Sequence, residues 1–153
     1  MKLNLGCGSK KIKGWINCDF DPLMKPDCIV DLNKRWPFKD SSIGEIRSDY
    51  LFEHVLDINH FISEAKRVLK RNGKFSIRTV NFFFWRIRLG YIFGNFSGST
   101  AFFIYHTWLF KPTTLVEFFR AKGLFAEIKG KGILPFPDLF YYSFEIKGHK
   151  RED

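Results

Sequence analysis

Short apolar segments that each stop at a glycine or an aspartate fill the first fifty residues of this chain. The segments and the residues that end them are Leu3–Leu5 with Gly6, Trp15–Cys18 with Asp19, Cys28–Val30 with Asp31, and Ile43–Ser48 with Asp49 and Tyr50. Short apolar runs separated by turn residues are typical of buried β-strands. Because the carboxyl ends of parallel strands meet at one edge of a sheet, the pattern predicts a ligand site at that edge.

The remainder of the chain alternates predicted helices and strands. A helix is predicted to begin after Asp57, whose side chain can cap it, and to end at Arg71-Asn72-Gly73, where Gly73 suits a left-handed turn. The other predicted elements are a strand at Phe75–Val80, a helix at Pro112–Lys122, and strands at Phe125–Ile128 and Tyr142–Ile146. This alternation indicates an α/β fold with a mostly parallel sheet. The early crossovers, Ser9–Gly14 and Phe20–Asp27, have room for a turn or two of helix at most, so the fold is trimmed.

Length and composition indicate one intracellular domain. The 153 residues suit a single domain, 1–153, with one core. The chain has no run of about eighteen apolar residues that would predict a membrane span, and its first residues do not resemble a secretory signal, so we expect a cytoplasmic protein. The cysteines form no C-x-x-C pair and the histidines lack metal-ligand spacing, so neither a disulfide framework nor a metal site is predicted.

The formal net charge of +9 allows two interpretations. One is an anionic partner, such as nucleic acid, an acidic protein or a membrane surface. The other is a solvated surface on which lysine is simply abundant. Charge alone does not separate the two.

The segment 81–110 is crowded with aromatic residues and also carries Arg86, Arg88 and several glycines. It follows the carboxyl end of the fifth predicted strand, where insertions in a doubly wound sheet lie over the ligand crevice. We therefore expect it to form a lid or substrate wall, with Trp85 and Arg88 as substrate-binding residues. A homodimer contact or an extension of the core explains the same aromatic richness, because an exposed aromatic patch of this size needs covering.

The residues at the four strand ends suit an adenosine-containing ligand without a phosphate. Gly6 and Gly8 let the backbone approach a ligand closely, and Asp19 can accept hydrogen bonds from both ribose hydroxyls. Phe20 is placed to pack on an adenine face and Asp31 to accept from its amino group. Dinucleotide binding needs a third glycine where Lys11 stands, and an acid later than Asp19. The plainer alternative is that these are only turn residues.

Several motifs follow one another in a set order along the chain. They are Leu3-Asn4-Leu5-Gly6-Cys7-Gly8, Gly14-Trp15-Ile16-Asn17-Cys18-Asp19, Asp31-Leu32, Trp36-Pro37-Phe38, Asp40-Ser41-Ser42, Glu53-His54, Arg67-Val68-Leu69-Lys70, Asn72-Gly73, and the later block His106-Thr107-Trp108-Leu109-Phe110. In this order they resemble the type 11-like class I S-adenosylmethionine (SAM)-dependent methyltransferases. The resemblance implies a Rossmann-like three-layer sandwich with a mostly parallel seven-stranded sheet in the order 3-2-1-4-5-7-6, the last strand antiparallel. No helix precedes the first strand, which is a departure from the family.

The resemblance also implies the cofactor, SAM, which becomes S-adenosylhomocysteine. The implied cofactor contacts are Asn4, Leu5, Gly6, Cys7, Gly8, Asp19, Phe20, Asp31, Leu32, Asp49 and Tyr50. Candidates for removing a proton from the acceptor are His54 and His106, the latter also as a substrate contact.

Few features of the sequence identify the methyl acceptor. Asp49-Tyr50-Leu51-Phe52 stands where common DNA base methyltransferases carry Asn-Pro-Pro-Tyr, so a DNA base is not expected. A protein side chain, a small molecule or an RNA group remains as acceptor. The alternative to an active methyltransferase is a SAM-binding scaffold of the same fold that has lost catalysis.

Overall fold

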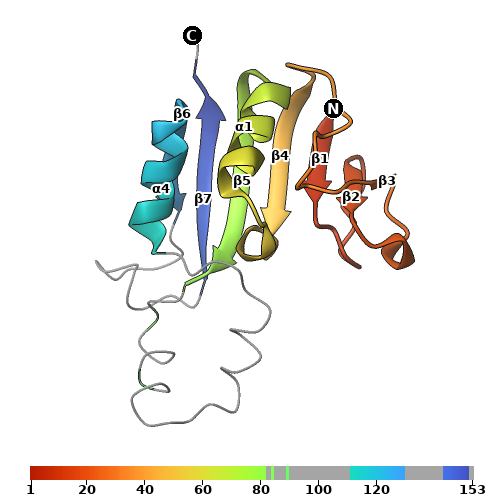
Figure 1. Cartoon of the computed structure of the whole chain (residues 1–153), viewed down its shortest axis with the longest axis horizontal. Helices are drawn as coiled ribbons and strands as arrows, with labels where there is room; N and C mark the ends of the chain where they lie inside the picture. The colour runs from red at the N-terminus through yellow and green to blue at the C-terminus, as the bar shows by residue number, and fades with distance from the viewer. Residues whose placement is uncertain (82–83, 85–88, 90–110, 130–142, 152–153) are drawn as a thin grey trace.

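The computed structural model describes residues 1–81, 84, 89, 111–129 and 143–151 (Figure 1). Its strands form one seven-stranded sheet in the order β3-β2-β1-β4-β5-β7-β6, which confirms the predicted order. The strands are β1 Lys2–Leu5, β2 Ile16–Asp19, β3 Cys28–Ile29, β4 Ile43–Asp49, β5 Leu69–Val80, β6 Leu124–Lys129 and β7 Ser143–Lys150. The helices are η1 Pro22–Met24, η2 Phe52–His54, α1 Ile58–Val68 and α4 Pro112–Ala121. Within the described ranges no helix has the length and apolar character that crossing a membrane requires.

Strand β7 is the antiparallel member of the sheet, as predicted. Strands β3, β2, β1, β4 and β5 pair in parallel, whereas β7 runs antiparallel to β5 on one side and to β6 on the other. The carboxyl ends of β1, β2, β3 and β4 therefore meet at one edge, as the strand-end pattern requires.

Helix α1 begins where predicted and ends earlier than predicted. The carboxylate of Asp57 accepts a hydrogen bond from the His60 N–H at 3.0 Å, which caps the helix. The helix ends at Val68, and β5 begins at the next residue, so the expectation that Arg71-Asn72-Gly73 ends a helix is wrong. Those residues form an irregularity in β5, between its pairings with Ile43 and with Glu45. The left-handed residue there is Asn72, with φ 57°, and not Gly73.

Both α-helices among the described residues cover the same face of the sheet (Figure 1). Aromatic side chains join them: Phe61 of α1 and Phe119 of α4 each contact Phe52, with ring centroids 5.1 and 5.8 Å apart. Phe119 also stacks on Phe75 of β5 at 4.9 Å. The buried core therefore lies between this face and the two helices, and we call it the covered face.

The opposite face, here called the open face, carries side chains in register that are polar except for Phe125. Residues that alternate with the core positions align across neighbouring strands in three rows. The rows are Lys2, Glu45, Lys74, His149 and Phe125; Asn4, Arg47, Ser76, Lys147 and Glu127; and Asp49, Arg78, Glu145 and Lys129. Parallel strands buried on both sides are usually apolar throughout. The trimming predicted from the short crossovers is thus concentrated on this face, where no helix lies among the described residues.

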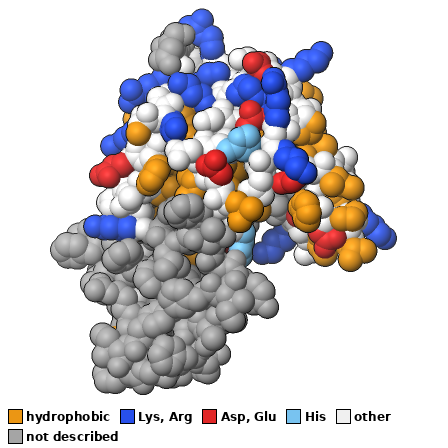
Figure 2. Space-filling view, in the orientation of Figure 1, with side chains coloured by type: hydrophobic (Ala, Val, Ile, Leu, Met, Phe, Trp, Pro, Cys, Tyr) orange, Lys and Arg blue, Asp and Glu red, His pale blue; other side chains and the backbone are white. Residues whose placement is uncertain are grey.

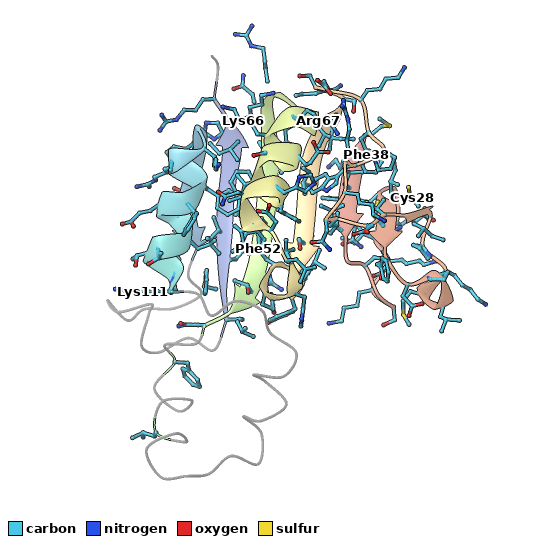
Figure 3. All side chains as sticks on the ribbon, in the orientation of Figure 1. Cys28, Phe38, Phe52, Lys66, Arg67 and Lys111 are labelled. Atoms are coloured by element: carbon cyan, nitrogen blue, oxygen red, sulfur yellow. The ribbon has the colours of Figure 1, made fainter. Side chains whose placement is uncertain are left out.

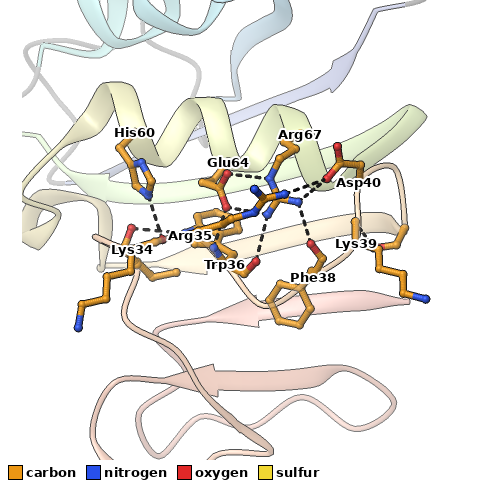
Figure 4. Close-up of polar contacts among 11 residues, drawn as sticks. Lys34, Arg35, Trp36, Phe38, Lys39, Asp40, His60, Glu64 and Arg67 are labelled. Atoms are coloured by element: carbon orange, nitrogen blue, oxygen red, sulfur yellow. Dashed lines mark hydrogen bonds and ion pairs between the residues drawn. The ribbon is translucent and has the colours of Figure 1, made fainter.

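A side-chain network replaces a helix in the crossover from β3 to β4. Arg67 of α1 donates to both carboxylate oxygens of Glu64 at 2.7 Å, and to Asp40 at 2.6 Å (Figure 4). It also donates to the backbone carbonyls of Trp36 at 3.0 Å and Phe38 at 2.8 Å. Figure 3 shows the Arg67 side chain reaching from α1 toward Phe38. The network ties residues 31–42 to α1, where the Trp36 ring is buried.

Candidate cofactor site

The turn after β1 is built from glycines that other residues would strain. Gly6 and Gly8 have φ values of 63° and 48°. These angles lie in the left-handed region, which favours glycine. At Gly6 a Cβ atom would also lie 2.9 Å from the side chain of Leu51, so the turn packs directly against the residue that follows Tyr50. The Cys7 N–H donates to the Cys18 carbonyl at 3.0 Å and fixes the turn to β2.

Asp19 fastens the same turn from the end of β2. One carboxylate oxygen accepts from the Gly8 N–H at 2.7 Å, and the other accepts from the Asp21 N–H at 3.0 Å. Each carboxylate oxygen has about two acceptor sites, so one remains on each for a ligand hydroxyl. The aspartate therefore has a structural role, and its role in ligand binding stays a prediction.

A cavity of about 480 Å³ opens between the ends of the first four strands and the turn that follows β4. Its lining brings together eight residues predicted for the site: Gly6, Gly8, Asp19, Phe20, Asp31, Leu32, Tyr50 and His54. The sequence reasoning missed Cys18, Val30, Asn33, Leu51 and Val55, which also line it. A cavity of this volume is within the range typical of small-molecule sites.

The other predicted cofactor residues lie away from this cavity. Asn4, Cys7 and Asp49 line a second, smaller cavity that shares Gly6 with the first. Leu5 lies in the core and is fully buried. The Asn4 amide donates to the Lys10 carbonyl at 3.0 Å and to Asn17 at 2.9 Å, which gives it a role in holding the turn.

Asp49 carries a buried oxygen that lacks a hydrogen bond. Its Oδ2 accepts from Nε and Nη2 of Arg47 at 3.1 and 2.7 Å, but Oδ1 is buried and has no hydrogen-bond partner in the described part of the chain. An unpaired carboxylate oxygen is costly in a folded protein. The Asp49 side chain is thus arranged to accept one more donor beside Gly6.

Tyr50 adopts a backbone conformation that is uncommon for a bulky residue. Its φ of 56° is left-handed. Such a conformation persists only where the surrounding structure holds it, and conformations of this kind cluster at functional sites. The N–H donates to the Arg78 carbonyl at 2.8 Å, and the hydroxyl donates to the Ser143 hydroxyl at 3.1 Å. The turn places the phenol at the cavity wall and Leu51 against Gly6.

Three titratable groups of the site, Asp31, Cys7 and Cys18, have pKa values shifted from the ordinary ones. Hydrogen bonds from the Asn33 backbone and the Lys34 side chain lower the pKa of Asp31, which is therefore ionised at neutral pH. Burial raises the pKa of Cys7, and burial together with the Cys28 thiol raises the pKa of Cys18 to about 12. Neither cysteine is a thiolate at neutral pH, so the site offers acceptor oxygens and no sulfur nucleophile from these two residues.

Three predicted residues, Trp85, Arg88 and His106, lie outside the described residues. Of the segment 81–110 the structure describes Asn81, Phe84 and Leu89. The predicted substrate wall and homodimer contact in this segment therefore stay predictions.

A protein-family model matches the first half of the chain. A methyltransferase domain model matches residues 3–77, which include the Gly6–Gly8 turn, β2, β4 and α1. A search of curated protein sequences finds no match to this chain.

Solved structures share the whole fold. A possible histamine N-methyltransferase of Thermotoga maritima is 18% identical with a TM-score of 0.73, over 98% of this chain and 81% of that one. A putative methyltransferase in complex with the Trm112 activator of Haloferax volcanii is 17% identical with a TM-score of 0.71, over 99% and 82%. A phosphoethanolamine N-methyltransferase of Haemonchus contortus, solved with S-adenosylhomocysteine, is 13% identical with a TM-score of 0.65, over 99% and 48%. These structures show that the chain has the fold of the class I SAM-dependent methyltransferases, and the domain model shows that residues 3–77 resemble a methyltransferase domain.

Proposed function

We propose that this protein binds SAM in the larger cavity and transfers its methyl group to an acceptor in the cytoplasm. The observation that carries the proposal is the convergence of Asp19 and Asp31 with the exposed ring of Phe20 around the Gly6–Gly8 turn. Carboxylates suit ribose hydroxyls and an adenine amino group, and an exposed aromatic ring suits an adenine face. The Phe20 side chain is 71% exposed, which a ligand on its face would relieve.

The donor set of this chain fits the cofactor. The cofactor carries an adenosine, a sulfonium and an α-amino acid end. The unpaired Oδ1 of Asp49 beside Gly6 supplies an acceptor of the kind that an ammonium group needs. The apolar side chains of Leu32, Leu51 and Val55 line the cavity and would keep water from it.

When bound, the cofactor supplies an electrophilic methyl group. The chain's own residues then have three tasks: to hold the adenosine, to exclude water, and to position the acceptor. Asp19 and Asp31 hold the polar groups of the adenosine, and the apolar wall excludes water. A ring nitrogen of His54, which lines the same cavity, accepts the proton that the acceptor loses. His106 is the second candidate for this task.

The acceptor remains a protein side chain, a small molecule or an RNA group. Two of the similar structures are described as N-methyltransferases of small amines, histamine as a possibility in one case and phosphomonomethylethanolamine as a bound ligand in the other. Their identity to this chain shows the fold alone, so small amines serve here as the first acceptors to assay.

The test is calorimetric binding of S-adenosylhomocysteine to the wild type, Asp19→Asn and Asp19→Ala. Loss of a charged acceptor weakens such hydrogen bonds by about 1.5–3 kcal/mol, so we expect affinity to fall roughly ten- to a hundredfold. Glu117→Ala, at an exposed residue of α4, is the matched control and leaves affinity unchanged. Unchanged affinity in both Asp19 variants would refute the ribose assignment.

Activity is tested separately with SAM that carries a tritiated methyl group. Wild-type protein transfers label to an acceptor in a cell lysate or in an amine panel, and Asp19→Ala does not. Tight binding of S-adenosylhomocysteine with no transfer to any acceptor would instead support the scaffold alternative.

A further inference from the structure

Cations are concentrated at the edge of the sheet where the parallel strands begin, opposite to the cofactor cavity. The segments 1–2, 39–42, 66–74, 122–124 and 147–151 meet there, because they enter β1, β4, β5 and β6 or leave the antiparallel β7. Figure 2 shows Lys and Arg side chains gathered at the top of the molecule, where Figure 1 places the amino ends of β1 and β4. We call this region the basic edge. Its exposed cations are Lys2, Lys39, Lys70, Arg71, Lys74 and Arg151.

Few carboxylates balance the charge of the basic edge. Asp40 is the acid in the five described segments, and it accepts a hydrogen bond from Arg67 at 2.6 Å. The side chains of Lys70, Arg71 and Lys74 are exposed and form no ion pair with a described residue. The opposite edge has the reverse character, because the strands that end there are followed by the carboxylates of the candidate cofactor site. Positive charge on this chain is therefore polarised toward one edge.

Planar side chains accompany the cations where the basic edge meets the open face. The Lys2 ammonium lies 5.2 Å from the centroid of the Trp15 ring. The Phe125 ring stacks on His149 with centroids 4.9 Å apart and an angle of 24° between the planes. All three rings are half-buried, so part of each contacts solvent. Lys2, Lys74, His149 and Phe125 belong to one row across the sheet, and at about 4.8 Å per strand the row with Trp15 is about 24 Å long.

The concentration of charge separates the interpretations of the net charge. A solvated lysine surface predicts cations on all sides of the molecule, with carboxylates among them. A membrane surface favours several exposed apolar side chains among the cations. Of the exposed apolar side chains in the described ranges, Phe20, Leu23 and Ile29 belong to the opposite edge, whereas Met1 belongs to the basic edge. A polyanion with planar bases matches both the cations and the rings, because phosphates bind Lys and Arg while bases stack on aromatic side chains.

We propose that the basic edge and the adjacent row of the open face bind a single-stranded nucleic acid. Lys70, Arg71 and Lys74 contact its phosphates, and the rings of Trp15 and Phe125 stack with its bases. A duplex hides the faces of its bases, so the rings favour a single strand. The inference goes beyond the proposed function and does not rest on it, because this surface and the cofactor cavity lie at opposite ends of the strands.

The experiment measures fluorescence anisotropy of a labelled oligouridine of about twelve nucleotides over a series of salt concentrations. Lys70→Ala/Lys74→Ala removes two cations from the basic edge. Lys10→Ala/Lys129→Ala is the matched control, because it removes the same charge from exposed residues near the opposite edge. Trp15→Leu removes a ring and keeps an apolar side chain. Circular dichroism shows whether each variant is folded, and a thymidine oligomer of equal length distinguishes RNA from DNA as the natural ligand.

We expect Lys70→Ala/Lys74→Ala to bind the single strand about fivefold or more weakly than the control does. Its plot of log affinity against log salt should be shallower by about 1.4, since each phosphate contact with a single strand contributes about 0.7. Trp15→Leu should bind about fivefold or more weakly with an unchanged slope.

Three results would overturn the proposal. One is equal weakening by the two double variants, which would mean that only total charge matters. Another is wild-type affinity in Trp15→Leu, which would exclude base stacking at this ring. The third is tighter binding of the wild type to an RNA duplex or to phosphatidylserine vesicles than to the single strand.

Discussion

The two faces of the sheet differ in how far their side chains are shielded from water. On the covered face, side chains such as Ile46 and Ile77 are removed from water by α1 and α4. On the open face, the next residues of the same two strands, Arg47 and Arg78, have polar side chains that can stay in contact with water. One buried layer of side chains is therefore enough to form the core. Apolar burial supplies most of the stabilisation, and the polar side chains of the open face cost little free energy when they contact water. The difference predicts that substitutions on the covered side have much the larger effects on stability.

The largest effect is expected at Phe119, which is fully buried between α4, Phe52 and Phe75. Phe119→Ala leaves a cavity in the core and should lower the free energy of unfolding by about 3–5 kcal/mol. Phe118→Ala is the matched control, because Phe118 is the preceding residue of α4 and is 41% exposed. Urea unfolding followed by circular dichroism measures both. Equal losses for the two variants would mean that the covered face is not the core.

The second-largest loss in the free energy of unfolding is expected for Arg67→Met. The substitution keeps much of the stem but removes donors to Glu64, Asp40 and two carbonyls, which leaves the buried Glu64 carboxylate without its cation. Breaking such a pair from one side costs about 3 kcal/mol, measured as the free energy of unfolding in urea. The control is Arg71→Met at an exposed position of β5. A loss below that of the control would show that residues 31–42 do not depend on this network.

The same network gives a smaller effect that depends on pH. Hydrogen bonds from Arg67 lower the pKa of Glu64 below its ordinary value. The stabilisation by ionised Glu64 is therefore complete above its unfolded pKa, about 4.3, and is lost as pH falls through the lower folded pKa. The difference in unfolding free energy between wild type and Glu64→Gln should be largest at pH 7 and shrink toward pH 3. A difference that stays constant over this range would contradict the assignment.

The smallest effect is expected on the open face. Lys2 pairs with Glu45 at 2.7 Å, but its side chain is 52% exposed. Exposed pairs contribute roughly 0–1 kcal/mol, so Lys2→Ala should change the free energy of unfolding by less than about 1 kcal/mol. The residual effect should fall further in added salt, which screens exposed charges. A loss comparable to that of Phe119→Ala would show that the open face is buried by another part of the protein.

The meeting of Asp19 and Asp31 at one edge of the sheet was predictable, because the end of a strand is a local feature of the sequence. The order of strands came from the resemblance, since no local pattern states which strands pair. The sequence pattern predicts an end of α1 that is too late, because glycine at position 73 is typical of the residue that ends a helix. In the structure Gly73 is needed for space: a Cβ there would lie 2.8 Å from the Lys70 carbonyl oxygen.

Other parts of the site depend on contacts between distant residues. Leu51 and Val55 line the cavity through the turn after β4, and their apolar character alone fits a core position equally well. The network of Arg67 joins α1 to a loop about thirty residues earlier. The open face was not predicted, although polar residues alternate with apolar ones through Ser76 and Arg78 in β5, a period-two pattern that indicates one solvated side.

The position of β7 has a consequence for how the chain is made. Strand β6 pairs with β7 and with no other strand of the described sheet, and β7 pairs with β5. During synthesis on the ribosome, residue 80 at the end of β5 is made long before residue 143 at the start of β7. The nascent chain therefore carries an open edge at β5 and an unpaired β6 until β7 is made. An unpaired strand edge can pair with a wrong strand. We therefore expect this protein to depend on late release from the ribosome or on chaperones to complete its sheet.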